Sequence, residues 1–184
     1  MAKLKVPVTA SDHSLGEEEA PAVLVEYGDY QCPHCAHAQP VIHALINHFG
    51  ERLRFIFRHF PLSQIHPEAE PAAETAEFAA AQNRFWEMHD AIFKNQQSLG
   101  LPLLSELTRG LGLSPEDLLE ALKAKTYAPV VREQFMGGVR SGVNGTPTFF
   151  INGVRFDGPA EFEDLVEAID AQLARAKIRR QRAG

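Results

Sequence analysis

Cys32 and Cys35 are the two cysteines of this 184-residue chain, and they stand three positions apart at a predicted strand–helix junction. The apolar run at 22–27 predicts a buried strand, and the apolar stripe at 33–49 predicts a helix. Two cysteines cannot form the disulfide framework of a small secreted scaffold, and a chain of this length can bury a core without one. The pair therefore requires a local chemical explanation.

The N-terminal half of the chain has the pattern of a βαβ unit. Gly50 is a typical C-terminal cap for the helix at 33–49, and a second strand is predicted at 53–60. Two strands joined by a helix in this way are expected to be parallel. Pro40 should kink the helix rather than end it, because the apolar period continues beyond it.

A helical stretch and a second group of strands follow. The pattern is helical from about residue 64 to 142. Strand signals return at 148–151 and 154–156, on both sides of Asn152-Gly153, which is a strong two-residue hairpin signal. A last amphipathic helix is predicted from residue 160 to about 177. The predicted order is β-α-β, a helical block, and then β-β-α.

The position of the cysteines favours redox chemistry. Cys32 falls at the helix N-terminus, where free N–H groups and the helix dipole stabilise an anion. Pro33 suits the first helical position, where its missing N–H would have no partner anyway. Cys35 lies one turn further along and is more buried. Because the thiolate is the reactive form, this arrangement separates an attacking thiol from a resolving thiol.

Other uses of the two cysteines fit the sequence less well. A zinc site could use Cys32, Cys35 and His37, but a structural zinc site needs a second ligand pair, and no further cysteine exists. Haem attachment requires a histidine directly after the second cysteine, where Ala36 stands. Inert core cysteines rarely flank Pro-His at such a junction. No nucleotide or haem signature occurs, so we expect neither a metal nor a cofactor.

Three sequence motifs resemble the DsbA-like branch of the thioredoxin superfamily. They are VLVEYGDYQCPHC at 23–35, FRHFPL at 57–62 and GTPTFFINGV at 145–154, and the resemblance extends from about residue 20 to 175. It implies an α/β thioredoxin fold, β-α-β then β-β-α, with a helical insertion between the halves. The implied domains are a thioredoxin-like domain formed by residues 1–63 and 143–184, and an inserted helical domain formed by residues 64–142.

The resemblance also implies an activity, a protein-disulfide oxidoreductase in which Cys32 attacks and Cys35 resolves. Thr146-Pro147 matches the position of a family proline with a cis peptide bond, where the backbone of Thr146 would pair with an extended substrate. Glu26 matches a family acid that shuttles a proton for the buried cysteine. Glu26 lies in an apolar strand, and burial raises the pKa of a carboxyl group.

His34 lies between the cysteines and is a further candidate. Its ring could donate a hydrogen bond to the Cys32 sulfur or add positive charge when protonated. Either interaction would favour the thiolate and stabilise the reduced state. The alternative is a solvent-facing His34, with only the helix dipole acting on Cys32.

We expect cysteine-containing proteins as substrates and a redox partner that is either a thiol pool or a membrane oxidant. A net charge of -6 argues against nucleic acid as a partner. No apolar run reaches the ~20 residues of a membrane helix, and no secretory signal is present. A cytoplasmic monomer is the preferred expectation, with a processed periplasmic or extracellular form as the alternative.

The direction of exchange stays open at this point. The CPHC form is associated with disulfide donors, which would stay reduced in the cytosol. Two alternatives to an oxidoreductase also remain. One is a redox-inactive, chaperone-like module that holds peptides near Thr146. The other is a glutathione-conjugating enzyme of the kappa type, which typically has a serine where Cys32 stands.

Overall fold

The computed structural model describes the backbone of residues 2–183 and the side chains of residues 2–175. Its centre is a five-stranded sheet with the strand order β1-β3-β2-β4-β5. The central strand β2 (Ala22–Gly28) is parallel to β3 (Leu53–His59) and antiparallel to β4 (Thr148–Ile151). The predicted parallel βαβ unit and the α/β thioredoxin fold are confirmed.

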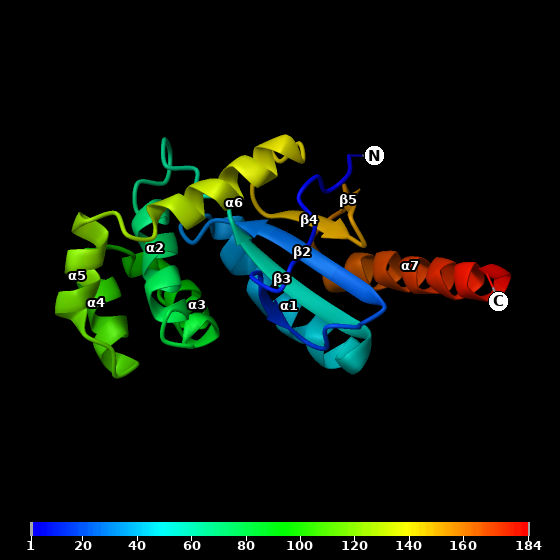
Figure 1. Cartoon of the computed structure of the whole chain (residues 1–184), viewed down its shortest axis with the longest axis horizontal. Helices are drawn as coiled ribbons and strands as arrows, with labels where there is room; N and C mark the ends of the chain where they lie inside the picture. Colours follow the sequence, from blue (N-terminus) through cyan, green and yellow to red (C-terminus); the bar gives the residue numbers. More distant parts are fainter. Residues whose placement is uncertain (1, 184) are drawn as a thin grey trace.

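Helices and the N-terminal segment cover both faces of the sheet. Helices α1 (Pro33–Phe49) and α7 (Phe162–Ala183) pack together on one face, and Figure 1 shows α7 projecting beyond the sheet. On the other face, Phe135 of α6 (Ala128–Arg140) stacks on Phe60 with ring centroids 4.4 Å apart. Since β2 is covered on both sides, its sequence is apolar at nearly every position.

The two edges of the sheet differ in how well the sequence predicts them. The hairpin of β4 and β5 (Val154–Phe156) turns at Asn152 and Gly153, which have φ values of 48° and 78°. Positive φ at both positions is the type I′ geometry expected for Asn-Gly. At the opposite edge, β1 (His13–Leu15) pairs antiparallel with β3 and was not predicted.

The helical insertion lies between β3 and β4, and Figure 1 shows most of it grouped at one end of the sheet. The helical pattern is interrupted between α2 and α3, where Asn83 has a φ of 58°. Ser114 caps its helix by accepting a hydrogen bond from the backbone N–H of Asp117 at 3.1 Å. That residues 64–142 form a separate domain stays a prediction. The helices between β3 and β4 are α2 (Ala69–Ala80), α3 (Phe85–Lys94), α4 (Leu101–Gly110), α5 (Pro115–Lys123) and α6.

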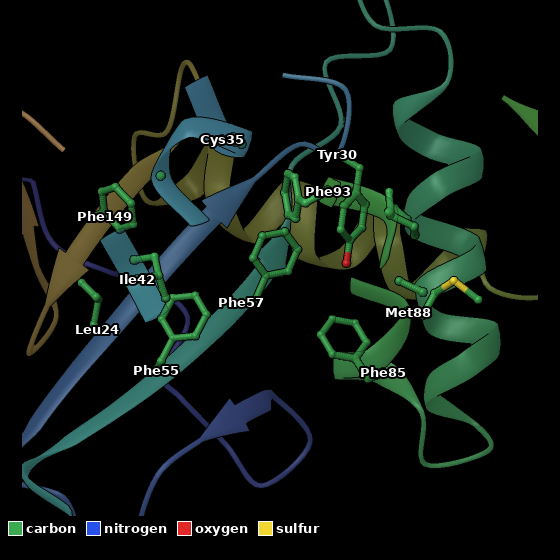
Figure 2. Packing of buried hydrophobic residues seen from close by; sticks show 14 of the residues in the cluster. Leu24, Tyr30, Cys35, Ile42, Phe55, Phe57, Phe85, Met88, Phe93 and Phe149 are labelled. Atoms are coloured by element: carbon green, nitrogen blue, oxygen red, sulfur yellow. The ribbon is translucent and has the colours of Figure 1, made fainter. Parts of the chain in front are cut away.

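One apolar core runs from the sheet into the insertion. Figure 2 shows Phe57 of β3 and Tyr30 beside Phe85, Met88 and Phe93 of α3, and all five side chains are buried. The ring centroids of Tyr30 and Phe93 lie 4.8 Å apart. The active-site segment after β2 is therefore packed directly against the insertion.

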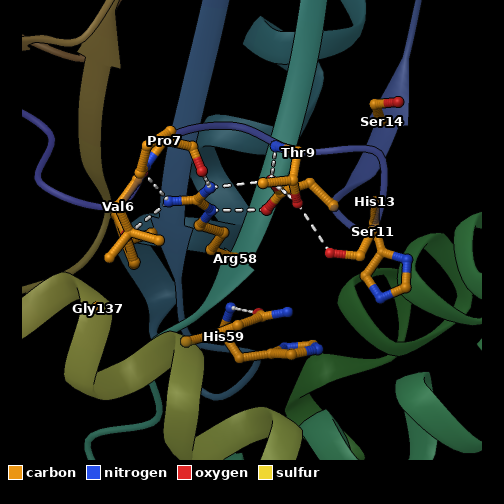
Figure 3. Close-up of polar contacts among 12 residues, drawn as sticks. Val6, Pro7, Thr9, Ser11, His13, Ser14, Arg58, His59 and Gly137 are labelled. Carbon is orange, nitrogen blue, oxygen red and sulfur yellow. Dashed lines mark hydrogen bonds and ion pairs between the residues drawn. The ribbon is translucent and has the colours of Figure 1, made fainter.

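A buried arginine fixes the N-terminal segment to the sheet. Arg58 of β3 donates to the carbonyl oxygens of Val6 and Pro7, both at 2.9 Å, and forms a two-point ion pair with Asp12 at 2.7 and 2.9 Å (Figure 3). Its guanidinium also donates to the hydroxyl of Tyr27 at 3.0 Å. Among the helices that the structure describes, none is both long and apolar enough to cross a membrane.

Candidate active site

The chain turns from β2 into α1 at the cysteine pair. Cys32 is the N-cap residue of α1 with an extended backbone, and Pro33 occupies the first helical turn. Cys35 lies inside that turn and is fully buried. Both cysteines are free thiols, so the structure represents the reduced form of the pair.

Hydrogen bonds favour the thiolate of Cys32. The bond with the Cys35 thiol has the largest effect, and bonds from Thr146 and from the backbone N–H groups of Cys35 and His34 add to it. Burial opposes ionisation, but the hydrogen bonds outweigh it and lower the pKa of Cys32 from 9.0 to about 5. Cys32 is therefore a thiolate at neutral pH.

Cys35 has the opposite character. Burial raises the pKa of its thiol well above 9.0, and the hydrogen bond to Cys32 and the negative charge of Glu26 act in the same direction. The backbone N–H of Asp29 donates to the Cys35 sulfur at 3.4 Å, which opposes this shift only weakly. The pair thus combines one ionised and one protonated thiol.

Glu26 lies on the α1 side of β2, on the same face as Leu24, as strand alternation predicts. Its side chain is fully buried, and neither carboxylate oxygen has a hydrogen-bond partner in the described part of the chain. Burial, followed by the negative charge of Cys32, raises the pKa of Glu26 to about 8. The carboxyl group is therefore mostly protonated at pH 7 and releases its proton as the pH rises through about 8.

Thr146 and Pro147 immediately precede β4 and bring the backbone of Thr146 beside Cys32. The peptide bond between them is cis. The thiol of Cys32 donates to the carbonyl oxygen of Thr146 at 3.3 Å. The hydroxyl oxygen of Thr146 is buried without a hydrogen-bond partner, so it is free to donate to the thiolate once Cys32 ionises.

Sequence reasoning missed Asp29, which organises the loop before Cys32. One carboxylate oxygen accepts hydrogen bonds from the backbone N–H groups of Gln31 at 2.7 Å and Cys32 at 3.2 Å. The other oxygen accepts from the N–H of Leu62 at 2.8 Å and lies 2.8 Å from Nδ1 of His66. An aspartate that precedes a helix by a few residues is a typical cap or turn residue, and this signal was available in GDYQC.

Gln96 was also missed, and no pattern in the sequence marks it. It lies in the short 3-10 turn η2 (Gln96–Ser98) of the insertion. Its Nε2 donates to the carbonyl oxygens of Tyr30 at 2.8 Å and Cys32 at 2.9 Å. The insertion therefore holds the active-site loop directly.

The fold brings Cys32, Cys35, Glu26, Thr146 and Pro147 together at one site. Pro33 and His34 are exposed at the start of α1. The His34 ring makes no hydrogen bond with the described residues, and the contribution of His34 to the Cys32 thiolate comes from its backbone N–H. His37 is exposed and faces Glu161, with 3.7 Å between Nε2 and Oε1.

The chain matches one protein family over most of its length. The family model described as thioredoxin, Thioredoxin_4, covers residues 9–171. A relative described as the Na(+)/H(+) antiporter NhaA 1 of Salinispora arenicola is 40% identical over 177 residues, which make up 96% of this chain and 27% of the relative. The chain therefore spans about a quarter of the length of this curated relative.

Solved structures share the whole fold. BdbD of Bacillus subtilis in its oxidised form has a TM-score of 0.84 at 24% identity, covering 94% of this chain and 98% of that one. Alpha-DsbA1 of Wolbachia pipientis has a TM-score of 0.81 at 22% identity, covering 96% and 97% of the two chains. The likeness extends over the sheet and the helical insertion together.

Proposed function

The chain belongs to the thioredoxin family described by Thioredoxin_4, and we propose that it exchanges a Cys32–Cys35 disulfide with cysteine-containing protein substrates. Family, fold and cysteine pair make it a DsbA-like thiol-disulfide oxidoreductase. The observation that carries the detailed proposal is the opposite shift of the two thiol pKa values, lowered for Cys32 and raised for Cys35. We propose disulfide donation as the favoured direction.

In this direction, a substrate thiolate attacks Sγ of Cys32 in the oxidised pair. The Cys32–Cys35 bond breaks, Cys35 leaves as a thiolate that takes up a proton, and a mixed disulfide joins Cys32 to the substrate. A second substrate thiolate then attacks the substrate sulfur. The substrate disulfide forms, Cys32 leaves as a thiolate, and the two electrons from the substrate remain on the dithiol.

The direction follows from the stability of the reduced form. Hydrogen bonds stabilise the Cys32 thiolate and have no equivalent in the disulfide. They therefore favour reduction of the pair, which makes the oxidised protein a strong disulfide donor. A low pKa also makes Cys32 a good leaving group in the second step.

Glu26 supplies the proton that the buried thiol needs. When Cys35 leaves as a thiolate in an apolar site, the protonated carboxyl group of Glu26 is the nearby acid. With a pKa of about 8, Glu26 can donate this proton and recover it near neutral pH. In the reverse direction, Glu26 would accept the proton from Cys35 before Cys35 attacks the mixed disulfide.

We propose that substrates bind as extended segments along Thr146 and Pro147. The carbonyl oxygen of Thr146 accepts a hydrogen bond from Cys32 only while that thiol is protonated. The Cys32 thiolate at neutral pH and the Cys32 sulfur of a mixed disulfide have no proton to donate, so this carbonyl is available to a substrate N–H. Backbone pairing of this kind gives affinity with little dependence on the substrate sequence.

A donor role has a consequence for location. A strongly oxidising pair would be held reduced by a cytosolic thiol pool, so donation requires an oxidising compartment and an oxidant partner. This proposal departs from the cytoplasmic expectation of the sequence. The chain spans about a quarter of the length of its antiporter relative. The proposed function therefore concerns this part alone and includes no ion transport.

The deciding experiment is the redox equilibrium of the Cys32–Cys35 pair with glutathione, followed by oxidation of a reduced, unfolded substrate protein. A potential well above that of a cytosolic thiol pool, with stoichiometric transfer of the disulfide, supports the donor role. A potential as reducing as that pool, with rapid reduction of insulin, supports a reductase instead. A glutathione-conjugating enzyme would act on an electrophile, and a peptide-holding module would do neither.

A further inference from the structure

A second group of ionisable side chains lies behind the active site, at the junction of three elements. His13 comes from β1, His59 from the end of β3 and Glu77 from α2. One ligand atom from each lies within 4.8 Å of the other two. Figure 3 shows His13 on the N-terminal segment and His59 on β3, two elements that pair as neighbouring strands.

The three side chains converge on one point. Nε2 of His13 lies 2.8 Å from Oε1 of Glu77, and Nε2 of His59 lies 2.9 Å from the same oxygen. The exposed fractions of the three side chains are 17% for His13, 1% for His59 and 8% for Glu77. Two imidazoles and one carboxylate thus meet in a nearly closed site, with solvent access on the His13 side.

We propose that His13, His59 and Glu77 bind a divalent metal ion of the zinc class, with water as the fourth ligand. Two histidines and one glutamate form an established three-ligand set for zinc, which leaves one tetrahedral position open. The partial exposure of His13 gives water and the ion a path to that position. The two cysteines do not take part, so the proposed site is separate from the exchange chemistry.

The geometry requires small adjustments to accept an ion. Zinc bonds of about 2.0–2.2 Å at tetrahedral angles place neighbouring ligand atoms about 3.3 Å apart. The two nitrogen–oxygen distances of 2.8 and 2.9 Å must widen by a few tenths of an ångström. His13 can provide this movement, because it lies on a three-residue edge strand. The His13 ring stacks on Phe85, with 3.5 Å between ring centroids.

The donor set also suits a cation, because it offers two imidazole nitrogens and one carboxylate oxygen. The neighbouring His89 is not a fourth ligand, because its two ring nitrogens contact the Tyr30 hydroxyl at 3.0 Å and Gln39 Oε1 at 3.1 Å.

The competing interpretation is a hydrogen-bonded triad in which both imidazoles share one carboxylate oxygen and no ion binds. A binding measurement on the full chain with an oxidised Cys32–Cys35 pair separates the two, because a disulfide cannot bind zinc as thiolates would. The protein is stripped with a chelator and dialysed. Zinc is then titrated by calorimetry, and cobalt by its visible absorption.

We expect one ion per chain, a cobalt spectrum of tetrahedral intensity and a rise in Tm with zinc, because an ion that binds the folded state stabilises it. His13→Asn and Glu77→Gln should each weaken zinc binding by about 100-fold or more, since even the loss of a residue that only orients a metal ligand costs about 10–100-fold. His48→Asn is the matched control, because His48 is exposed on α1 outside the group. The zinc affinity of this variant should equal that of the wild type.

Two results would overturn the proposal. One is the absence of saturable binding to the oxidised wild-type protein. The other is zinc binding that His13→Asn leaves at full strength. His13→Asn is the decisive variant even if Glu77→Gln fails to fold, because His13 is the most exposed of the three and lies at a sheet edge.

Discussion

Nε2 of Gln96 donates a hydrogen bond of 2.9 Å to the carbonyl oxygen of Cys32, and so joins the helical insertion to the residue that we propose as the attacking thiol. The same Nε2 donates to the carbonyl oxygen of Tyr30 at 2.8 Å. These two carbonyl groups precede α1 and lie in the loop that positions its N-terminus. The insertion therefore contributes to the geometry on which the reactivity of Cys32 depends.

Replacing Gln96 by alanine should loosen this loop. The Tyr30 carbonyl group loses its donor, whereas the Cys32 carbonyl group keeps the N–H of Ala36 at 3.2 Å. Leaving a buried carbonyl group unpaired costs about 1–3 kcal/mol. We expect the free energy of unfolding to fall by an amount in this range and the pKa of Cys32 to become less depressed. Urea unfolding of the reduced protein and pH-dependent thiolate absorption measure the two effects. Gln97→Ala, at an exposed neighbour, is the control, and equal behaviour of the two variants would contradict the role of Gln96.

The two thiols should differ sharply in reactivity. With a pKa of about 5, Cys32 should react with iodoacetamide well below pH 7, while Cys35 stays protected. The lowered pKa stabilises the folded reduced protein fully above pH 9, and this contribution is lost as the pH falls through about 5. Mass spectrometry of the alkylated protein identifies the modified residue. First modification at Cys35 would reverse the assigned roles.

Substitution of each cysteine gives a separate test of the same assignment. Cys32→Ser should abolish disulfide exchange, because the variant has neither the Cys32 thiolate nor a Cys32–Cys35 disulfide, and the Cys35 thiol is buried. Cys35→Ser should retain the attack and accumulate mixed disulfides, because no resolving thiol follows. Non-reducing gels with a substrate that carries a disulfide distinguish the two outcomes, because a thiolate forms a mixed disulfide by breaking an existing disulfide. Accumulation of mixed disulfides by Cys32→Ser would show that Cys35 attacks.

The sequence predicts the elements whose signals are local. The apolar run at 22–27, the cap at Gly50 and the Asn152-Gly153 turn each specify a backbone shape through a few adjacent residues, and the structure has each of them. The edge strand β1 was missed because His-Ser-Leu is too short to show alternation. It is a strand because its backbone pairs with β3, about 40 residues away along the chain.

The residues of the candidate site also fall into those with a local sequence signal and those without one. Cys32, Cys35 and Glu26 are visible in the sequence, because a CXXC pair and an acid in an apolar strand are unusual patterns. Gln96 and the His13–His59–Glu77 group are not visible in the sequence, because their contacts join residues that are far apart in it. Gln96 and Cys32 are 64 positions apart, and so are His13 and Glu77. Polar residues in loops and on helices carry no periodic signal until the fold places them together.

Glu26 should make the free energy of unfolding depend on pH, and Glu26→Gln should remove this dependence. Its folded-state pKa of about 8 lies above its ordinary value of 4.5. The stability that this difference contributes is fully present below pH 4.5 and is lost as the pH rises through about 8. The slope reaches at most about 1.4 kcal/mol per pH unit. In the oxidised protein no thiol titrates and the Cys32 charge is absent, but burial, the larger cause, still raises the pKa of Glu26, so Glu26→Gln should flatten the stability profile above pH 4.5.

Glu51→Gln, at an exposed position, is the control and should leave that profile unchanged. Glu26→Gln should also slow the steps that move a proton to or from Cys35, with little effect on attack at Cys32. Chemical denaturation across the pH range and stopped-flow kinetics provide the two measurements. An unchanged stability profile and unchanged rates would show that the carboxyl group has no role in proton transfer.

The last prediction compares Thr146 and His34 in their effect on the pKa of Cys32. Thr146 has a buried hydroxyl that can donate to the thiolate, whereas the His34 ring is exposed and can act only through its charge in solvent. Water and salt screen exposed charges, so the buried hydroxyl should have the larger effect. We expect Thr146→Val to raise the pKa of Cys32 more than His34→Ala does.

Both substitutions should also shift the redox potential, in fixed proportion to the shift in the pKa of Cys32. The thiolate exists only in the reduced form, so weakening it destabilises the dithiol and makes the pair more reducing. One unit of pKa corresponds to about 1.4 kcal/mol, which for two electrons is about 30 mV. A plot of potential against the pKa of Cys32 for the wild type, His34→Ala and Thr146→Val should therefore be a line of about that slope. If His34→Ala shifts the potential while leaving the pKa unchanged, its ring acts on the disulfide rather than on the thiolate, and the thiolate account of His34 is wrong.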